Sequence, residues 1–512
     1  MSRARRVFAA FGIGVVNQAL AAAVGLWVTR FTLHRIGPHD YGLWVIAGQV
    51  LAYMVLLDLG VVALLPREIS VAAGKGGDPE ARDAELRDLF ERSMSLVLLL
   101  VPVLALGSIA ILALLPAQWA ALRGPLAVYL ALYVTAYPFR LVGAVLTGLQ
   151  ELSFTAMTQT LSFLVGAAAT VTLVVFGFGL YALAVGGIAG QLIAALAGLT
   201  RLFSHHRRVL PRRFRWASLD VIRRHFAPGL WVSLGQLAHV MLNATDVLVI
   251  GRILGPDGAL KFSFTDKTEN ILSVQPFAIG NLAGPTLGEL KGSGRQGEVS
   301  RIVGIIAAST LILSGAVVLA VLETNHAFVR SWIGEQYFGG MALTATILAN
   351  MMARHWQFTY SVGIFYYSGR VRESTLILLA DGVVSLGLSI ILVQHLGIVG
   401  APLGSLISVL VTAWPASVIL ISRDSGTSPW ASFAPVVPWL VRFVPLAIVA
   451  GATGVWLGES SLLIVAGAGA IIGIAYIAAV LPLLRRPPLA VYAEPWLAKI
   501  PLLDRILKRA GS

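Results

Sequence analysis

The chain has 512 residues, of which 57% are hydrophobic and only 12% are charged. A soluble protein would carry about twice that charged fraction, and the mean hydropathy of +0.82 points the same way. The composition therefore excludes an ordinary soluble domain. The absence of cysteine excludes disulfides and cysteine-ligated metal, while the net charge of +13 raises nucleic-acid binding as an alternative to be weighed.

Stretches of about 20 apolar residues recur along the chain, and each can cross the ~30 Å hydrocarbon core of a bilayer as a helix. We predict an all-α polytopic membrane protein with fourteen transmembrane spans. They lie near residues 7–29, 41–65, 93–115, 124–147, 152–176, 180–200, 226–250, 260–284, 301–322, 339–365, 374–394, 398–421, 437–457 and 461–483. The first follows a basic flank, as a signal peptide does, but its apolar run continues to Thr29. We predict an uncleaved helix there.

Positive charge is distributed unevenly between the two sides of this topology. If the N-terminus is cytoplasmic, most of the 38 Lys and Arg residues lie in the two tails and in the loops that follow even-numbered spans. The positive-inside rule then places both termini in the cytoplasm. The basic charge orients the protein and contacts anionic lipid, so we expect no nucleic-acid partner.

The chain also repeats itself. The stretch RIGPHDYGLW follows the first span, and RILGPDGALKF follows the seventh. Aligning Gly37 with Gly255 gives an offset of 218 residues, and the same offset pairs Gly179 with Gly397. One offset at both ends predicts two pseudo-symmetric six-helix lobes in the same orientation, plus two C-terminal helices. Transporters built from repeats bind their substrate at the repeat interface.

This repeat divides the chain into five predicted parts. They are an N-lobe (1–200), a basic cytoplasmic linker (201–225), a C-lobe (226–421), helices 13 and 14 (422–484) and a basic cytoplasmic tail (485–512).

Polar side chains interrupt several predicted spans. In the seventh span they recur at spacings of 3, 4 and 3, which places them on one helix face: Gln236, His239, Asn243 and Asp246. Further groups are Asp266, Lys267, Glu269, Asn270 and Ser273 in the eighth, Tyr133, Tyr137 and Arg140 in the fourth, and Arg354, His355, Gln357 and Tyr360 in the tenth. Such groups either fix helix packing by hydrogen bonds or line a hydrated cavity. For the seventh and eighth spans together we favour a cavity.

Asp58 lies within the second predicted span, where a charge at the bilayer centre costs ~3 kcal/mol. Arg67 follows nine residues later, about 900° around a continuous helix, so the two side chains would face opposite sides. We expect Arg67 to lie near lipid headgroups. We expect Asp58 to find a partner on another helix.

Several short motifs resemble those of one family, the polysaccharide-flippase branch of the multidrug/oligosaccharidyl-lipid/polysaccharide exporter superfamily. That branch has an L-G-x-x-x-Y-G stretch after helix 1, matched here by IGPHDYG from Ile36, and an L-D-L-G element followed by an arginine, matched by LDLG from Leu57 and by Arg67. The stretch LTGLQELSFTAM resembles its junction of helices 4 and 5, where Glu151 replaces a commonly basic residue. NATDVLVIGRILGP resembles the end of its helix 7. The likeness covers nearly the whole chain.

The resemblance implies a multi-pass protein of the bacterial cytoplasmic (inner) membrane, with two lobes that rock around a central cavity in alternating access. It implies that the substrate is an undecaprenyl-pyrophosphate-linked oligosaccharide, moved from the cytoplasmic to the outer leaflet for surface polysaccharide biosynthesis, with helices 13 and 14 as a groove for its lipid tail. Guanidinium groups bind pyrophosphate well. The expected binding residues are Arg30, Arg67, Arg140, Lys267 and Arg354 for the pyrophosphate, and Gln236, Asn243, Tyr133 and Tyr137 for the sugars.

The energy source is expected to be an ion gradient or the supply of substrate. The chain has no G-x-x-x-x-G-K-[ST] loop, so we expect no ATP hydrolysis, no enzyme activity, no cofactor and no metal. The candidates for carrying a proton or a sodium ion are Asp58, Asp246 and Glu269. Expected partners are the lipid-linked oligosaccharide, membrane lipids and the polysaccharide polymerase or export machinery.

Three alternatives remain. A cation-coupled multidrug antiporter of the same superfamily would share the fold, but such relatives usually have twelve helices and a cavity with fewer arginines. A glycosyltransferase or polymerase of lipid-linked sugars needs a catalytic outer loop, whereas the longest one predicted here, 323–339, is short and holds few catalytic groups. A purely structural membrane scaffold is disfavoured by the repeat with polar stripes inside it.

Overall fold

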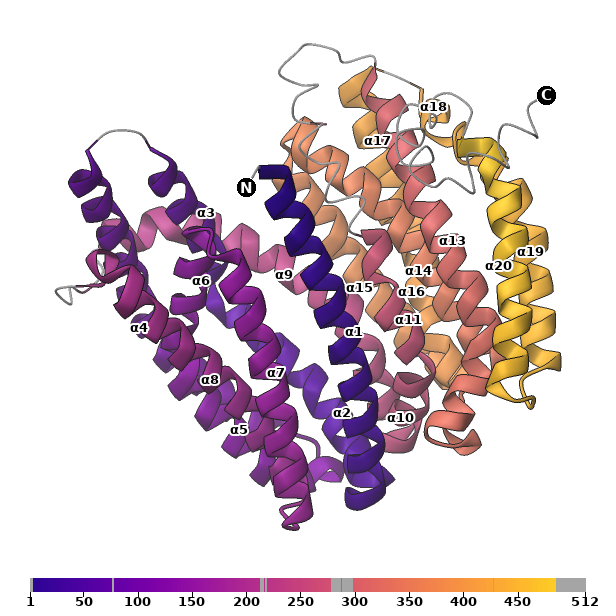
Figure 1. The fold of residues 1–512 in the computed structure, drawn as a ribbon, viewed down its shortest axis with the longest axis horizontal. Helices are drawn as coiled ribbons and strands as arrows, with labels where there is room; N and C mark the ends of the chain where they lie inside the picture. The colour runs from indigo at the N-terminus through magenta and orange to yellow at the C-terminus, as the bar shows by residue number, and fades with distance from the viewer. Residues whose placement is uncertain are drawn as a thin grey trace. The chain divides into compact units, whose positions relative to one another are not determined.

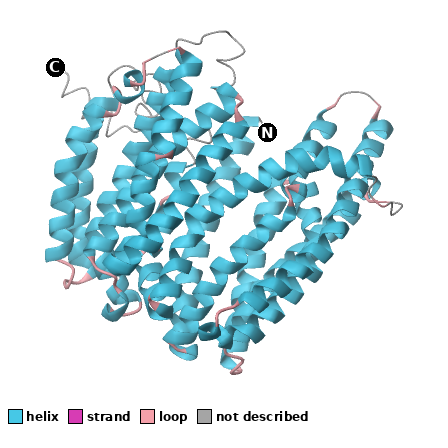
Figure 2. Ribbon diagram, turned by 180° about the vertical axis from the view of Figure 1, so that it is seen from behind, coloured by secondary structure: helices cyan, strands magenta, loops and turns pink. Residues whose placement is uncertain are grey.

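The computed structural model describes residues 3–75, 78–211, 216, 219–277, 287, 298–426 and 428–484. Across these residues the chain forms helices joined by short turns, with no strand among them (Figure 2). The prediction of an all-α membrane protein is therefore confirmed for the described part of the chain. The predicted tail, 485–512, and the end of the eighth predicted span lie outside it.

The chain divides into two compact units, Met1–Val240 and Met241–Ser512. The boundary falls inside one long helix, and the predicted division at the 201–225 linker remains a prediction. The helices that begin in the first unit are α1 (Arg3–Ile36), α2 (Pro38–Ala52), η1 (Tyr53–Asp58), α3 (Val61–Gly74), α4 (Pro79–Leu114), η2 (Ala117–Leu122), α5 (Arg123–Ala136), η3 (Tyr137–Phe139), α6 (Arg140–Gly148), α7 (Leu152–Val175), α8 (Leu180–His205), η4 (Arg207–Val209) and α9 (Leu219–Ile253) (Figure 1).

The second unit contains the end of α9 and, among the described residues, the helices that follow it. They are α10 (Gly255–Thr265), α11 (Lys267–Leu272), α13 (Val299–Trp332), η6 (Glu335–Tyr337), α14 (Met341–Gly363), η7 (Ile364–Ser368), α15 (Val371–Leu396), η8 (Gly397–Val399), α16 (Gly400–Val411), α17 (Ala413–Ser425), α18 (Trp430–Phe433), α19 (Val437–Trp456) and α20 (Leu462–Leu484). One apolar core of this unit gathers α13, α14, α19 and α20 and includes the buried side chains of Trp439 and Tyr476.

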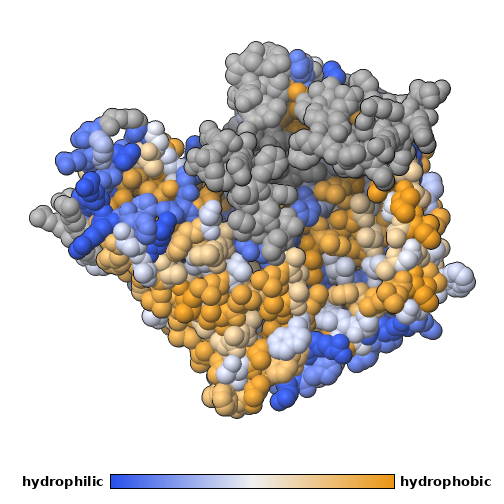
Figure 3. All heavy atoms as spheres, in the orientation of Figure 1, coloured by the Kyte–Doolittle hydropathy of each residue, from blue (hydrophilic) through white to orange (hydrophobic). Residues whose placement is uncertain are grey.

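Ten helical stretches of the described residues are long and apolar enough to cross a membrane. One of them, Val371–Ser425, carries two of the predicted spans. Helix α14 is not among the ten, and Arg354, His355 and Gln357 interrupt its apolar sequence. On the face drawn in Figure 3, hydrophobic residues form a broad surface and hydrophilic residues gather toward the helix ends. This distribution is what a bilayer requires of a multi-pass protein.

The repeat is visible in the backbone. Gly37 and Gly255 both have positive φ, 96° and 81°, and each is followed by a proline in the first turn of the next helix. Gly179 (φ 53°, ψ −131°) and Gly397 (φ 62°, ψ −144°) adopt nearly the same conformation before α8 and η8. Residues with a side chain rarely adopt such conformations. The paired glycines therefore impose the same two turns on each half.

The second predicted span is not one continuous helix. After η1 the chain passes through Leu59 and Gly60, with φ of 47° and 72°, before α3 begins. Gly60 allows the backbone of α9 to pack closely against this turn, because a Cβ at position 60 would lie only 3.2 Å from the Cα of Gly229. The angular argument that separates Asp58 from Arg67 on one helix therefore does not apply.

The fourth predicted span is also broken. Helix α5 ends at Ala136, a 3-10 turn with Pro138 follows, and α6 begins at Arg140. Proline lacks an N–H and clashes with the preceding turn, so it interrupts an α-helix. The break places Arg140 in the wall of a cavity of the first unit and leaves Tyr137 buried beside it.

Candidate functional site

The first unit encloses a cavity of about 710 Å³ among α2, α3, α5, α6, α7 and α8. We call it the tyrosine–arginine cavity. Its aromatic wall is Tyr129, Tyr133, Phe139 and Phe154, its one charged lining residue is Arg140, and its neutral polar groups are Thr147, Thr155, Thr158, Gln159, Ser162 and Gln191. A site of this size lies within the ~300–1,000 Å³ range of small-molecule pockets.

Arg140 is held against the aromatic wall. Its guanidinium donates a hydrogen bond of 2.8 Å to the Tyr133 hydroxyl. Its Cζ lies 6.0 Å from the Tyr133 ring centroid and 5.7 Å from that of Tyr137. No carboxylate of the described residues is within ion-pair distance of this guanidinium. The cavity therefore presents a positive charge that its own walls do not neutralise.

Asp58 lies beside this site, because it accepts a hydrogen bond from the backbone of Val62, which lines the cavity. It is 2% exposed and does not line the cavity. The Tyr137 hydroxyl donates a short hydrogen bond to its Oδ1, and the backbone N–H of Val62 donates another of 3.3 Å to the same oxygen. Asp58 thus joins the start of α3 to the break between α5 and α6. The predicted partner on another helix is Tyr137.

The second unit holds a smaller pocket of about 170 Å³ among α9, α10, α11, α14 and α16. We call it the acidic pocket. Polar groups contribute much of its lining: Asn243, Asp246, Asp266, Glu269, Asn270, Ser273, Asn350, Arg354 and His355. Asp246 accepts a hydrogen bond of 3.4 Å from Ser389, and Asp266 accepts a short one from Asn270. Within the described part of the chain, Asp246, Asp266 and Glu269 form no ion pair.

The positive charge of Arg354 in this pocket is already paired. Its Nη1 lies 3.0 Å from the Oδ2 of Asp381 on α15, which is fully buried. Its Nη2 donates to the Ser405 hydroxyl at 2.6 Å, while the Asp381 carboxylate also accepts from Ser408 and Thr412 at 2.5 and 3.2 Å. The pair ties α14 to α15 and α16. Arg354 therefore forms its ion pair outside the set of three pocket carboxylates, which have no described cation paired with them.

Asp246, Asp266 and Glu269 are half-buried and share one pocket, and carboxylates brought together in this way favour a bound proton or cation that offsets part of their charge. The described residues contain no group of three or more His, Asp or Glu side chains arranged to hold a metal ion. His355 completes the lining: it is 1% exposed, its Nδ1 lies 2.7 Å from the Ser314 hydroxyl, and its Nε2 has no described partner. The chemistry of this pocket fits a proton or a weakly held monovalent cation.

The structure brings some of the predicted site residues together and not others. Tyr137 adjoins Arg140 in the first unit, and Asn243, Asp246, Glu269 and Arg354 share the acidic pocket. Six line neither of these two cavities: Arg30 toward the end of α1, Asp58 at the end of η1, Arg67 on α3, Tyr137 at the start of η3, Gln236 on α9 and Lys267 on α11. The roles of all these residues remain predictions.

Two important groups escaped the sequence analysis. Asp381 lies in the apolar run LILLADGVVSLGL, and a single carboxylate in such a run is itself a signal of a buried partner. Tyr129 lies four residues before Tyr133, and the two rings stack with centroids 6.3 Å apart. The four-residue spacing of Tyr129, Tyr133 and Tyr137 could have indicated a row of tyrosines along one helix face.

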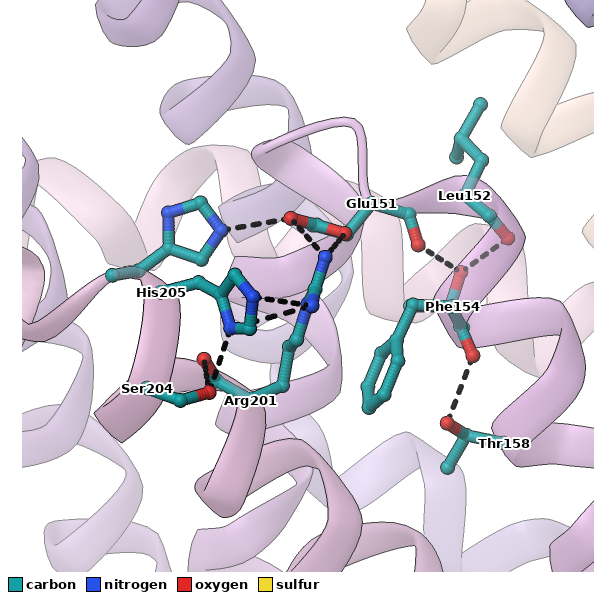
Figure 4. A network of polar contacts seen from close by, with 9 residues as sticks. Glu151, Leu152, Phe154, Thr158, Arg201, Ser204 and His205 are labelled. Carbon is teal, nitrogen blue, oxygen red and sulfur yellow. Dashed lines mark hydrogen bonds and ion pairs between the residues drawn. The ribbon is translucent and has the colours of Figure 1, made fainter.

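A polar network lies at the junction of α6 and α7 (Figure 4). The Glu151 carboxylate forms an ion pair with Arg201 at 3.0 Å and contacts the His206 ring at 2.9 Å. Arg201 also lies over the Phe154 ring, with its Cζ 5.4 Å from the centroid. The hydrogen bond from His206 is the main cause that holds the pKa of Glu151 below its ordinary value. Partial burial opposes it, and the hydrogen bond and charge of Arg201 add to the lowering. The network fixes the end of α8 against the start of α7.

Comparison with known proteins gives one family and several solved structures. The profile of the family described as polysaccharide biosynthesis protein matches residues 6–291. The lipid II flippase MurJ in an inward closed conformation superposes with a TM-score of 0.65 at 12% identity, over 92% of this chain and 98% of that one. No curated protein matches the sequence.

Multidrug transporters have a similar fold. An inward-facing multidrug resistance MATE family transporter of the MOP superfamily superposes with a TM-score of 0.61 at 16% identity, over 80% of this chain and 96% of that one. The MATE multidrug transporter DinF-BH gives 0.58 at 16% identity, over 80% and 93%. At these identities the likeness establishes that this chain shares its fold with these transporters and with MurJ.

Proposed function

The chain belongs to the polysaccharide biosynthesis protein family, and from that premise we propose that it is a flippase of a polyprenyl-pyrophosphate-linked oligosaccharide. It moves this lipid from the cytoplasmic to the outer leaflet by alternating access. Transport is the whole of its activity, and the chain catalyses no reaction on its substrate.

The observation that carries this proposal is the uncompensated guanidinium of Arg140 in the tyrosine–arginine cavity. A pyrophosphate presents several anionic oxygens, and arginine binds such groups through paired N–H donors. Tyrosine rings beside it supply the flat apolar faces and hydroxyls that sugars require. Arg140 donates to Tyr133 and lies over two rings, so its orientation is fixed before substrate arrives.

We propose that the acidic pocket couples transport to a proton or a sodium ion. Asp246 and Glu269 are the carriers in this proposal, with Asn243 and Asn350 as neutral oxygen donors. Arg354 is the only described guanidinium that lines this pocket, and its ion pair with Asp381 occupies it. In this proposal Arg354 therefore has a supporting role and does not bind the ion.

A cation-coupled multidrug antiporter is the second candidate function. The acidic pocket favours it, because a small, carboxylate-rich site suits cation exchange better than binding of an anionic lipid. The tyrosine–arginine cavity weighs against it, since an uncompensated guanidinium repels cationic drugs. The flippase therefore remains our conclusion.

The remaining expectations from the sequence belong to the same proposal. Both termini face the cytoplasm, the protein sits in the bacterial inner membrane, and the flipped oligosaccharide passes to a polysaccharide polymerase or export machinery. Arg30, Arg67 and Lys267 contact the phosphate at other stages of the cycle, and Gln236 contacts the sugars.

The test uses a strain that lacks the gene and carries an inducible copy for rescue. Lipid extracts are analysed by mass spectrometry for undecaprenyl-pyrophosphate oligosaccharides. We expect a complete repeat unit to accumulate without the gene, and the wild-type copy to clear it. Arg140→Gln should not clear it, because the substituted amide cannot neutralise a pyrophosphate.

Arg123→Gln is the matched control, since Arg123 is exposed at the start of α5 and does not line the cavity. It should rescue like the wild type. An unchanged lipid-glycan profile in the deletion strain, with intact surface polysaccharide, would reject the flippase. Efflux of a cationic dye that depends on the gene would then establish the antiporter.

A further inference from the structure

The first unit has a second large cavity, which shares only Phe139 with the lining of the tyrosine–arginine cavity. It is a groove of about 740 Å³ between α4, the break before α6, the end of α8 and η4. Its floor is apolar and includes Phe90, Met94, Val142 and Leu199. Its rim carries two arginines, Arg207 and Arg208. We call it the α4–α8 groove.

The groove lies at the level where the chain passes from membrane to water. Helix α4 is charged from Glu80 to Arg92 and apolar from Ser93 onward. Phe90 and Met94, which line the groove, flank that change. A 36-residue helix is also much longer than the ~20 residues needed to cross a bilayer, so its charged part projects beyond the hydrocarbon core. The arginines of the rim are therefore at headgroup depth.

The backbone that carries these arginines is held on two sides. Arg87 of α4 donates hydrogen bonds of 3.0 and 2.6 Å to the carbonyl oxygen of Arg208. On the other side, the neighbouring residue His206 contacts the Glu151 carboxylate at 2.9 Å. Turn η4 thus keeps a fixed position although both arginine side chains are exposed.

The charge of the rim is largely uncompensated. Within the described part of the chain, Arg207 forms no ion pair, and Arg208 reaches only Asp83, at 3.9 Å. Arg87 adds a third guanidinium beside them. An arginine near a membrane surface attracts anionic lipid by about 1 kcal/mol per charge. The groove combines this anion-binding rim with an apolar floor, and it is therefore complementary to an amphiphile with an anionic head and an apolar tail.

We propose that the α4–α8 groove binds one anionic phospholipid of the surrounding bilayer, with the phosphate at Arg207 and Arg208 and an acyl chain along Phe90, Met94 and Leu199. The bound lipid fills the space between α4 and α8 and holds the two helices in register. This site does not depend on what the protein transports.

The experiment is native mass spectrometry of the full-length protein purified in detergent. The protein is incubated with equal amounts of phosphatidylglycerol and phosphatidylcholine, and the retained lipids are counted. The wild type should retain one phosphatidylglycerol in preference to phosphatidylcholine. Arg207→Gln/Arg208→Gln should lower this preference on the order of tenfold or more, because two interfacial charges are lost.

Two further variants make the result specific. Arg92 is an exposed residue of α4 that does not line the groove, so Arg92→Gln should retain the lipid. Leu199→Trp fills the floor and leaves the rim intact, and it should lose the lipid. Retention by Leu199→Trp with loss in the double variant would mean attraction to surface charge alone and would overturn the proposal.

Two other outcomes also overturn it. Equal retention of both lipids by the wild type would remove the basis for an anionic site. Displacement of phosphatidylglycerol by undecaprenyl phosphate at a tenth of its concentration would assign the groove to a polyprenyl carrier. Because purified protein and defined lipids are used, none of these outcomes depends on the flippase assay.

Discussion

The Tyr137 hydroxyl donates a hydrogen bond to the Asp58 carboxylate, which lies 79 residues earlier in the chain. Both residues sit where a helix is interrupted: Asp58 ends η1 before the left-handed turn at Leu59 and Gly60, and Tyr137 begins η3 between α5 and α6. The bond therefore joins two breaks in two membrane helices. A carboxylate in this position stabilises the fold and is shielded from the cavity beside it.

Tyr137→Phe should destabilise the protein by about 2 kcal/mol, because a buried carboxylate loses one of its two described donors. The measurement is the melting temperature of the protein in detergent, with unfolding monitored by tryptophan fluorescence. Tyr366→Phe is the control, since Tyr366 is 41% exposed. Equal melting temperatures for both variants would show that the bond contributes little.

Replacement by the amide should separate the roles of Asp58 and Asp246. Asp58→Asn keeps an oxygen that accepts from Tyr137 and Val62, so we expect its transport to be close to wild type. Asp246→Asn removes a carboxylate of the acidic pocket and should lower transport on the order of tenfold through lost ion coupling. The assay is clearance of the accumulated lipid-linked oligosaccharide. Full activity of Asp246→Asn would exclude Asp246 as a carrier.

The Arg354–Asp381 pair should behave as one unit in a double-mutant cycle. Asp381→Leu alone leaves a partly buried guanidinium without its carboxylate, and Arg354→Met alone leaves a fully buried carboxylate unpaired. Each should cost about 3–5 kcal/mol. The double variant should recover more than half of the summed loss in thermal stability. Additive losses would show that the two groups are not coupled.

The Glu151 network should make stability depend on pH in the acidic range. The pKa of Glu151 is lower in the folded protein than its ordinary value of 4.5. Its contribution is therefore complete above about pH 4.5 and is lost as the pH falls through the folded pKa. Since the ion pair is partly exposed, it should be worth ~1 kcal/mol or less.

The measurement for this network is the melting temperature of wild type and Glu151→Gln at about pH 7 and about pH 3.5. The difference should be present at the higher pH and should shrink at the lower one. A difference that grows on acidification would mean that the neutral carboxyl, and not the carboxylate, is the stabilising form.

The sequence was informative about where helices lie and which residues share a helix face, because the length of an apolar run and its periodicity are local properties. It predicted the all-α membrane fold and the repeat, and the paired turns at Gly37 and Gly255 follow from residues visible in the chain. The break at Leu59 and Gly60 was not predictable, because it depends on the close approach of Gly229 from 169 positions later. Hydropathy alone continues the helix through that point.

The limits were similar at the two candidate sites. Periodicity placed Asn243 and Asp246 on one face of α9, and both line the acidic pocket. It did not reveal which helix supplies a partner, so Tyr137 could not be matched with Asp58 or Asp381 with Arg354. Such pairs are set by tertiary packing, and a single sequence carries no direct record of them.

The paired left-handed glycines bear on how the protein is made. A nascent chain leaves the ribosome from its N-terminus, and compact units fold in that order. Gly37 and Gly179 supply the turns of the first unit from within its own sequence, and Gly255 and Gly397 do the same for the second. The first unit therefore has both of these turn signals before the second is synthesised, so each half can form them during translation by the same local rules.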